Sequence, residues 1–130
     1  MSRVSVNILG IVVKGVRKGS EIGFPTINVQ ISNAPKNVAF GIYVCLIEIK
    51  GASYNAVMHY GTKSIGTDDK GAVFCEVHVF DFNRDVYGLE VSVNLLKKIR
   101  DVRQFESDED LIKQIKKDIV IANKYFKKNA

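Results

Sequence analysis

Residues 41–60 read GIYVCLIEIKGASYNAVMHY, in which two strand-like runs flank a short turn. Gly41 to Ile49 and Tyr54 to Tyr60 are rich in Val, Ile and Tyr, and their apolar residues mostly recur with a period of two. The residues between them, Lys50-Gly51-Ala52-Ser53, have a composition that favours a turn. The stretch therefore predicts two β-strands joined by a turn.

The same pattern extends to both sides of this stretch. Similar alternating runs predict further strands at Val4 to Val13, Thr26 to Ile31, Ala72 to Phe80 and Leu89 to Lys97. Clusters of Gly, Asn, Asp and Lys separate the runs and favour turns. A short helical turn is expected at Phe82 to Val86. Six short strands with turns between them indicate a mainly β protein built as a closed antiparallel barrel.

The period changes after Phe105, where a C-terminal helix is predicted. Apolar residues now recur every three or four positions, at Leu111, Ile112, Ile115, Ile119, Ala122 and Phe126. Ser107 is a suitable N-cap, acidic residues follow it, and lysines occupy the other end, as the helix dipole favours. We expect the apolar face of this helix to pack on the barrel.

The composition is that of one globular domain spanning residues 1–130. Cys45 and Cys75 lie in apolar strand-like runs and lack the spacing of a metal site, and the N-terminus does not resemble a signal peptide. We therefore expect a cytoplasmic protein with reduced thiols. No apolar run approaches the roughly 20 residues that a membrane-spanning helix needs, so no membrane association is expected.

The net charge of +5 raises the question of an anionic partner. Much of the excess comes from lysines near the C-terminus, and no aromatic residues alternate with them as stacking platforms for bases. A solvated helix face explains this charge better than a nucleic-acid site does, and we expect no nucleic-acid partner. The charge remains compatible with an anionic small molecule such as a nucleotide.

Glycines at positions 10, 15, 19 and 23 precede the run Phe24-Pro25-Thr26-Ile27-Asn28. Glycine-rich loops can bring backbone N–H groups around phosphate, although spaced glycines more often serve turns. Thr26 and Asn28 alternate along a predicted strand, so their side chains face the same way. Their oxygens could hold Mg²⁺ together with nucleotide phosphate. Alternatively, both side chains face the barrel interior and bond to the backbone.

A second candidate segment contains Glu76, His78 and Phe80, which share one face of a predicted strand opposite Cys75, Val77 and Val79. Glu76 either points to solvent or lies at a mouth of the barrel, where it could accept a proton from a substrate hydroxyl. His78 could be a second site group, but a structural role is more common for a single strand histidine. Arg100, after the last predicted strand, could stabilise transferring charge or simply lie in an exposed loop.

In this order, these segments closely resemble riboflavin kinase (flavokinase) along nearly the whole chain. The glycine-spaced loop and Gly23 to Asn28 match a G-F/I-P-T-A-N motif, with Ile27 in place of the usual alanine. A G-V/I-Y strand of the family is matched by Gly41-Ile42-Tyr43. An E-x-H-x-x-D-F segment that leads to D-x-Y-G is matched by Glu76, His78, Asp81, Phe82, Asp85, Tyr87 and Gly88. The last loop and helix of the family are matched by Arg100, Phe105, Ser107 and Leu111.

The resemblance implies a six-stranded Greek-key barrel with a C-terminal helix and ATP:riboflavin 5′-phosphotransferase activity, giving FMN and ADP. It implies that Thr26 and Asn28 hold Mg²⁺ or another divalent ion and that Glu76 is the general base. It places Gly15, Gly19, Gly23, Pro25, Thr26 and Asn28 around the nucleotide phosphates. Arg100 and Phe105 are expected on a flap at the riboflavin side. A monomer is expected.

The sequence departs from the family pattern at three places. His59 to Ile65 stands where N-I-G-x-x-P-T is usual, and Asp101-Val102 stands where P-E is usual. The third departure is Ile27. The altered loops at His59 to Ile65 and Asp101-Val102 motivate an alternative, a non-catalytic flavin- or nucleotide-binding barrel. We also considered a basic barrel that binds nucleic acid, motivated by charge alone. Because no adenylyltransferase domain precedes residue 1 in this sequence, FMN formation without FAD synthesis is expected.

Overall fold

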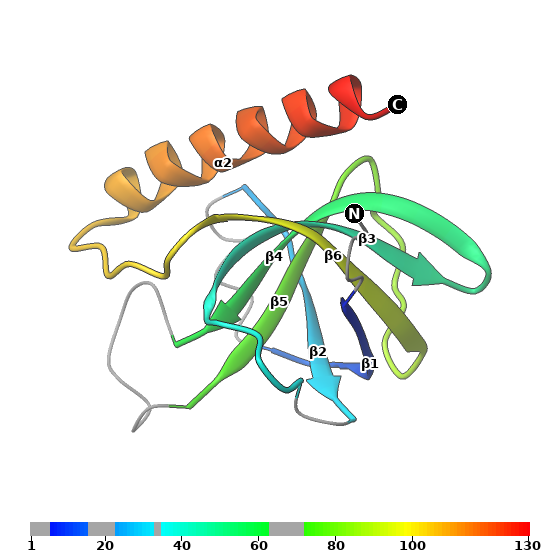
Figure 1. Cartoon of the computed structure of the whole chain (residues 1–130). Coiled ribbons are helices and arrows are strands. Elements are labelled where there is room, and N and C mark those ends of the chain that lie inside the picture. The colour runs from blue at the N-terminus through cyan, green and yellow to red at the C-terminus, as the bar shows by residue number, and fades with distance from the viewer. Residues whose placement is uncertain (1–5, 16–22, 33–34, 63–71) are drawn as a thin grey trace.

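Six β-strands form a closed antiparallel barrel in the computed structural model, which describes residues 6–15, 23–32, 35–62 and 72–130 (Figure 1). The elements are β1 (Val6–Val13), β2 (Ile27–Ile31), β3 (Gly41–Ile49), β4 (Ala52–Gly61), β5 (Phe74–Val79), β6 (Glu90–Arg100) and the helix α2 (Asp108–Lys128). The strand order around the barrel is β1-β2-β5-β4-β3-β6. Since β3, β4 and β5 are consecutive neighbours and β6 returns beside β3, the topology contains a Greek key. The predicted fold is confirmed.

The barrel closes around an apolar interior, to which most strands turn every second side chain, while β3 is buried along most of its length. On β5, for example, Cys75, Val77 and Val79 are buried whereas the residues between them are half-buried on the outer face. Side chains from all six strands fill the interior, including Ile8, Val29, Ile47, Met58, Val77 and Val93. The interior is therefore a packed core, and the barrel wall offers its outer face for chemistry.

The two cysteines are free thiols inside this core. Burial raises the pKa of the Cys75 thiol to about 12, with a smaller contribution from the neighbouring Glu76 carboxylate. Burial also raises the pKa of Cys45 well above its ordinary value. Both thiols are therefore protonated at neutral pH and act as small apolar side chains.

The strand bounds differ from the predicted ones by a few residues at their ends, while residues 4 and 5 of the first predicted strand lie outside the described part of the chain. The helical turn predicted at Phe82 to Val86 is wrong. The chain turns at Asp81, whose φ is 55°, and the Asp85 side chain accepts a hydrogen bond from the backbone N–H of Tyr87. These local side-chain bonds favour a turn over a helix.

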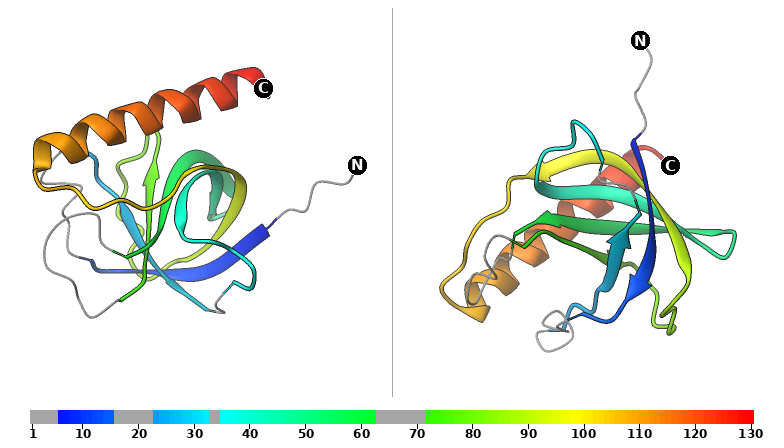
Figure 2. Two further views of the ribbon diagram at one scale, coloured as in Figure 1. Left: turned by 60° about the vertical axis from the view of Figure 1, so that its left-hand side comes forward. Right: turned by 90° about the horizontal axis from the view of Figure 1, so that it is seen from below.

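The helix α2 lies across the outside of the barrel against β3 and β4 (Figures 1 and 2). Ser107 caps it as predicted, because its side chain accepts a hydrogen bond from the backbone N–H of Asp110. Leu111 and Ala122 are buried against the barrel, and so is the charged residue Asp118. In the described part of the chain, no helix combines the length and apolar character needed to cross a membrane.

Candidate active site

Asn28 and Glu76 lie directly opposite each other on the neighbouring strands β2 and β5. The next pair along the ladder, Ile27 and Val77, belongs to the inner face, since Val77 is fully buried and Ile27 packs against the core. Because side chains alternate along a strand, Asn28 and Glu76 both project from the outer face, about 5 Å apart at their Cβ atoms. The site is thus on the barrel wall, and the alternative that placed Asn28 in the interior is wrong. The position of Glu76 near a mouth of the barrel stays a prediction.

A row of residues continues from this pair across the outer face. His59 on β4 lies opposite Glu76, Ile42 on β3 lies opposite His59, and Arg100 on β6 lies opposite Ile42. The row therefore crosses β2, β5, β4, β3 and β6. It links the candidate metal and base residues to the strand that carries Arg100.

His59 is the neighbour of Glu76 that sequence reasoning missed, because the predicted strand Tyr54 to Tyr60 does not by itself show which residue of another strand lies opposite His59. Its Nε2 donates a hydrogen bond of 2.7 Å to the backbone carbonyl of Thr62. Burial lowers the pKa of His59; the bond to Thr62 partly opposes this effect, and the positive charge of Arg100 adds to it. The imidazole beside Glu76 is therefore neutral at physiological pH.

The segment before β2 brings Thr26 to the same region. Gly23 has a φ of 93°, which favours glycine, and the chain then runs through Pro25 into β2. The Pro25 carbonyl accepts a 2.7 Å hydrogen bond from His78 Nδ1 on β5. Thr26 is half-buried and precedes Asn28 by two residues, so an extended chain points both side chains to the outer face.

Gly15, just beyond the end of β1, lies against the side chain of Asn28. A Cβ atom at Gly15 would lie 2.0 Å from Asn28 Nδ2 and 2.3 Å from Asn28 Oδ1. Only a residue without a side chain leaves the amide in its present place. This contact is a structural reason for the second of the four spaced glycines. Gly19 lies outside the described residues.

The donors at this site suit Mg²⁺. A threonine hydroxyl and an asparagine amide supply neutral oxygen atoms, and Mg²⁺ usually takes few protein ligands and completes its shell with water and phosphate. The described residues contain no group of three or more His, Cys, Asp or Glu side chains arranged to hold a metal ion alone. Thr26 and Asn28 thus fit an ion that arrives with a nucleotide.

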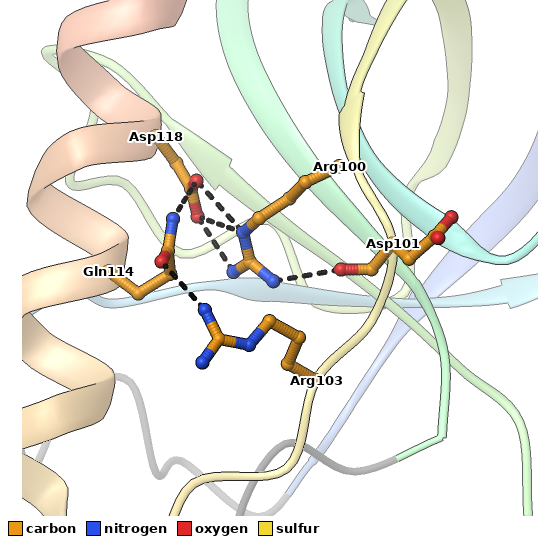
Figure 3. Close-up of polar contacts among 5 residues, drawn as sticks. All are labelled: Arg100, Asp101, Arg103, Gln114 and Asp118. Carbon is orange, nitrogen blue, oxygen red and sulfur yellow. Dashed lines mark hydrogen bonds and ion pairs between the residues drawn. The ribbon is translucent and has the colours of Figure 1, made fainter.

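Arg100 forms a buried ion pair with α2 (Figure 3). Its Nε donates to Asp118 Oδ1 at 2.9 Å and its Nη2 to Asp118 Oδ2 at 2.8 Å, while the Asp118 side chain is only 3% exposed. Gln114 donates to the same carboxylate, and the Arg100 guanidinium also lies over the Phe105 ring. The pair fixes the end of β6 to the helix. A contact of Arg100 or Phe105 with substrate stays a prediction.

A shallow hollow of about 380 Å³ lies elsewhere, on the outer face of β1, β6, β3 and β4. It is lined by Asn7, Leu46, Glu48, Ser53, Ser92 and Asn94. None of the predicted site residues lines it. The candidate active site is therefore the wall around Asn28 and Glu76, to which the structure adds His59, His78 and the contact with Gly15.

Fold and site together define a closed six-stranded antiparallel barrel whose outer wall presents neutral oxygen donors beside a carboxylate. Comparison with known proteins identifies the family of this barrel protein. A family model described as riboflavin kinase (flavokinase) matches residues 3–126. The chain belongs to the riboflavin kinase family.

Curated relatives are longer than this chain. A bifunctional riboflavin kinase/FMN adenylyltransferase from Bacillus subtilis is 38% identical over 120 residues, covering 92% of this chain and 38% of the relative. The RNA-binding riboflavin kinase RibR from the same organism is 40% identical over 121 residues, covering 92% of this chain and 50% of the relative. The chain thus spans half or less of the length of these relatives.

Solved structures share the fold. A Streptococcus pneumoniae protein described as a macrolide-efflux protein superposes with a TM-score of 0.81 at 34% identity, covering 92% of this chain and 39% of that one. Riboflavin kinase from Trypanosoma brucei superposes with a TM-score of 0.63 at 23% identity, covering 98% of this chain and 83% of that one. The second similarity supports the fold alone.

Proposed function

We propose that this protein is an ATP:riboflavin 5′-phosphotransferase that converts riboflavin to FMN and releases ADP. The observation that carries the proposal is the pairing of Asn28 with Glu76 across β2 and β5, in a chain of the riboflavin kinase family. This pairing supports the proposal because Asn28 and Glu76 occupy adjacent positions of one sheet, as a metal ligand and a base acting on the same substrates would need to do. Phosphoryl transfer requires such positioning more than it requires covalent participation of the protein.

In this mechanism the hydroxyl of Thr26 and the amide oxygen of Asn28 would hold a divalent ion, which would neutralise charge on the nucleotide phosphates. Gly15 keeps the Asn28 amide in place, and the segment from Gly23 to Pro25 would lie along the phosphates. Gly19, outside the described residues, remains a predicted phosphate contact. Glu76 accepts the proton of the ribityl 5′-hydroxyl as that oxygen bonds to the γ-phosphorus. The bond from the γ-phosphorus to the β–γ bridging oxygen breaks, and ADP leaves.

The decisive experiment mixes the protein, riboflavin, ATP and Mg²⁺ and resolves the flavins by chromatography. We expect FMN to form in proportion to enzyme and ATP. Riboflavin and nucleotide binding without FMN, under conditions in which a known flavokinase turns over, would instead identify a non-catalytic binding barrel. Absence of both binding and turnover would contradict the proposal altogether.

The same chromatogram tests the expectation that the chain produces FMN but no FAD, since FAD elutes separately. Salt-dependent retention of single-stranded nucleic acid tests the expected absence of a nucleic-acid partner. A cytoplasmic location and a monomeric state also stay predictions. The free, buried thiols of Cys45 and Cys75 support a reducing compartment.

A further inference from the structure

Both histidines of the chain lie beside Glu76, and each binds the backbone carbonyl of a neighbouring loop. His59 lies opposite Glu76 across β4 and β5, and its ring bonds to Thr62. His78 follows Glu76 by two residues on the same face of β5, and its Nδ1 is 2.7 Å from the Pro25 oxygen. A carbonyl oxygen only accepts hydrogen bonds, so Nδ1 of His78 carries the proton.

The His78 ring is held on both sides as well as at Nδ1. The Phe24 ring meets it edge to face, with centroids 6.0 Å apart and an interplanar angle of 80°. The Phe80 ring lies 5.7 Å away at 64°. Such edge contacts stabilise one orientation of the ring. His78 therefore fastens Phe24 and Pro25 to β5 across 53 residues of sequence.

The hydrogen bond lies where the ladder between β2 and β5 ends. Its register pairs Asn28 with Glu76 and Ile27 with Val77. One further step in the same register would bring Thr26 opposite His78. Pro25 has no N–H group and cannot extend the ladder as a donor. Its carbonyl oxygen can still accept a hydrogen bond, and the His78 side chain supplies one from β5 at this point.

We propose that His78 is a positioning residue whose Nδ1–H bond to Pro25 holds the Thr26 hydroxyl beside Asn28 to receive the metal-bound nucleotide. This inference rests on the proposed function. His78 acts through Pro25 and Thr26, and its imidazole takes no part in proton transfer. Loss of the bond removes a contact between the segment before β2 and β5, so nucleotide binding must then order Pro25 and Thr26 at a larger entropic cost.

Three substitutions separate the hydrogen bond from the shape of the ring. In His78→Asn the amide nitrogen can take the place of Nδ1, in His78→Gln it reaches the place of Nε2, and His78→Leu has no donor. The measurement is calorimetric titration of ADP at a series of Mg²⁺ concentrations. We expect the Mg²⁺ concentration for half-maximal ADP affinity to rise about five-fold in His78→Leu and His78→Gln and less than about two-fold in His78→Asn.

Phe80→Leu, just beyond the end of β5, is the matched control, because it removes one ring contact but keeps the His78 bond to Pro25 and the Phe24 contact. Its Mg²⁺ requirement should stay within about two-fold of the wild-type value, well below that of His78→Leu. Riboflavin affinity without nucleotide should be unchanged in all four variants. Urea unfolding of each variant identifies those that are folded under the assay conditions. If His78→Leu does not fold, comparing the Mg²⁺ requirements of His78→Asn and His78→Gln tests the proposal.

The inference is overturned if His78→Leu or His78→Gln retains the wild-type Mg²⁺ requirement, or if His78→Asn is impaired as much as they are. If the wild-type enzyme is active and any of these results is found, the role of His78 is rejected and the proposed function stands. If the wild-type protein makes no FMN but the variants show the expected order of Mg²⁺ requirements for ADP binding, the proposed function is rejected and the role of His78 stands. Wild-type protein without Mg²⁺-dependent ADP binding rejects both.

Discussion

Asn28 and Glu76 face each other across one antiparallel strand pair, on the outer surface of a barrel whose interior is filled by apolar side chains. Hydrogen-bonded strands hold both backbones, so the relative position of the amide and the carboxylate does not depend on a flexible loop. The two proposed functional groups therefore lie on two neighbouring strands. β2 carries the proposed metal ligand and β5 the proposed base.

Glu76→Gln should slow turnover far more than it weakens nucleotide binding. The amide keeps the size of the side chain but cannot accept the hydroxyl proton, so we expect kcat to fall by about 10²- to 10⁴-fold. ADP affinity should change less than about three-fold, because Glu76 is not among the proposed metal ligands. Steady-state kinetics and calorimetry measure the two effects. Comparable losses in both would contradict the assignment of Glu76 as the base.

Thr26→Val should raise the metal requirement because it removes the hydroxyl and retains the branched shape. Loss of a metal-supporting contact commonly costs at least about ten-fold in metal affinity. Thr26→Ser retains the hydroxyl and serves as the control, with a requirement close to that of the wild type. The measurement is initial rate as a function of Mg²⁺ at saturating ATP. Equal Mg²⁺ curves for the two variants would exclude Thr26 as a ligand.

Gly15→Ala should impair function while leaving the fold stable. The new Cβ would lie 2.0 Å from the Asn28 amide, which is the end of a side chain and can rotate away. We therefore expect a urea midpoint close to the wild-type value and a rise in Mg²⁺ requirement similar to that of Asn28→Ala. The double variant should be no worse than Asn28→Ala, since both changes act on one amide. Additive losses would show that Gly15 acts elsewhere.

Asp118→Ala should be strongly destabilising because it leaves Arg100 buried without its partner. Removing one member of a buried ion pair costs about 3 kcal/mol or more in the free energy of unfolding. The double variant Arg100→Met with Asp118→Leu removes both charges and should recover most of that loss. Urea denaturation measures both. A loss below about 1 kcal/mol in Asp118→Ala would show that the pair contributes little to attaching α2.

Stability should fall as the pH is lowered from about 7 to about 5, with His59 contributing. The pKa of His59 is lower in the folded protein, chiefly through burial, than its ordinary value of 6.5. The unfolded chain therefore binds a proton first as the pH falls through 6.5, and this favours unfolding. His59→Asn removes that contribution, so its urea midpoint should depend less on pH. Parallel pH profiles for the two proteins would refute this explanation.

The sequence predicts local structure well where one face of an element is buried. The alternation from Cys75 to Val79 correctly separates the outward Glu76 and His78 from the core. The period-four stripe and Ser107 correctly define α2. The turn after β5 was mistaken for a helix because the side-chain bond from Asp85 competes with helical hydrogen bonds.

The sequence does not reveal which residues become neighbours across strands. The pairing of His59 with Glu76 depends on the register between β4 and β5, which is set by the whole barrel. Asp118, in contrast, carried a usable signal. It falls on the apolar stripe between Leu111 and Ala122, and a carboxylate at such a position indicates a buried cationic partner.

Ile27 points inward against Val77, while its two neighbours in sequence face the proposed nucleotide. The extra side-chain volume of Ile27, compared with the alanine that is usual in the family, is therefore accommodated in the core. Chemistry and thermal robustness can then be engineered independently in β2. Resizing Ile27 together with Val77 addresses heat resistance, while the adjacent outward positions remain free for altering phosphate-donor preference.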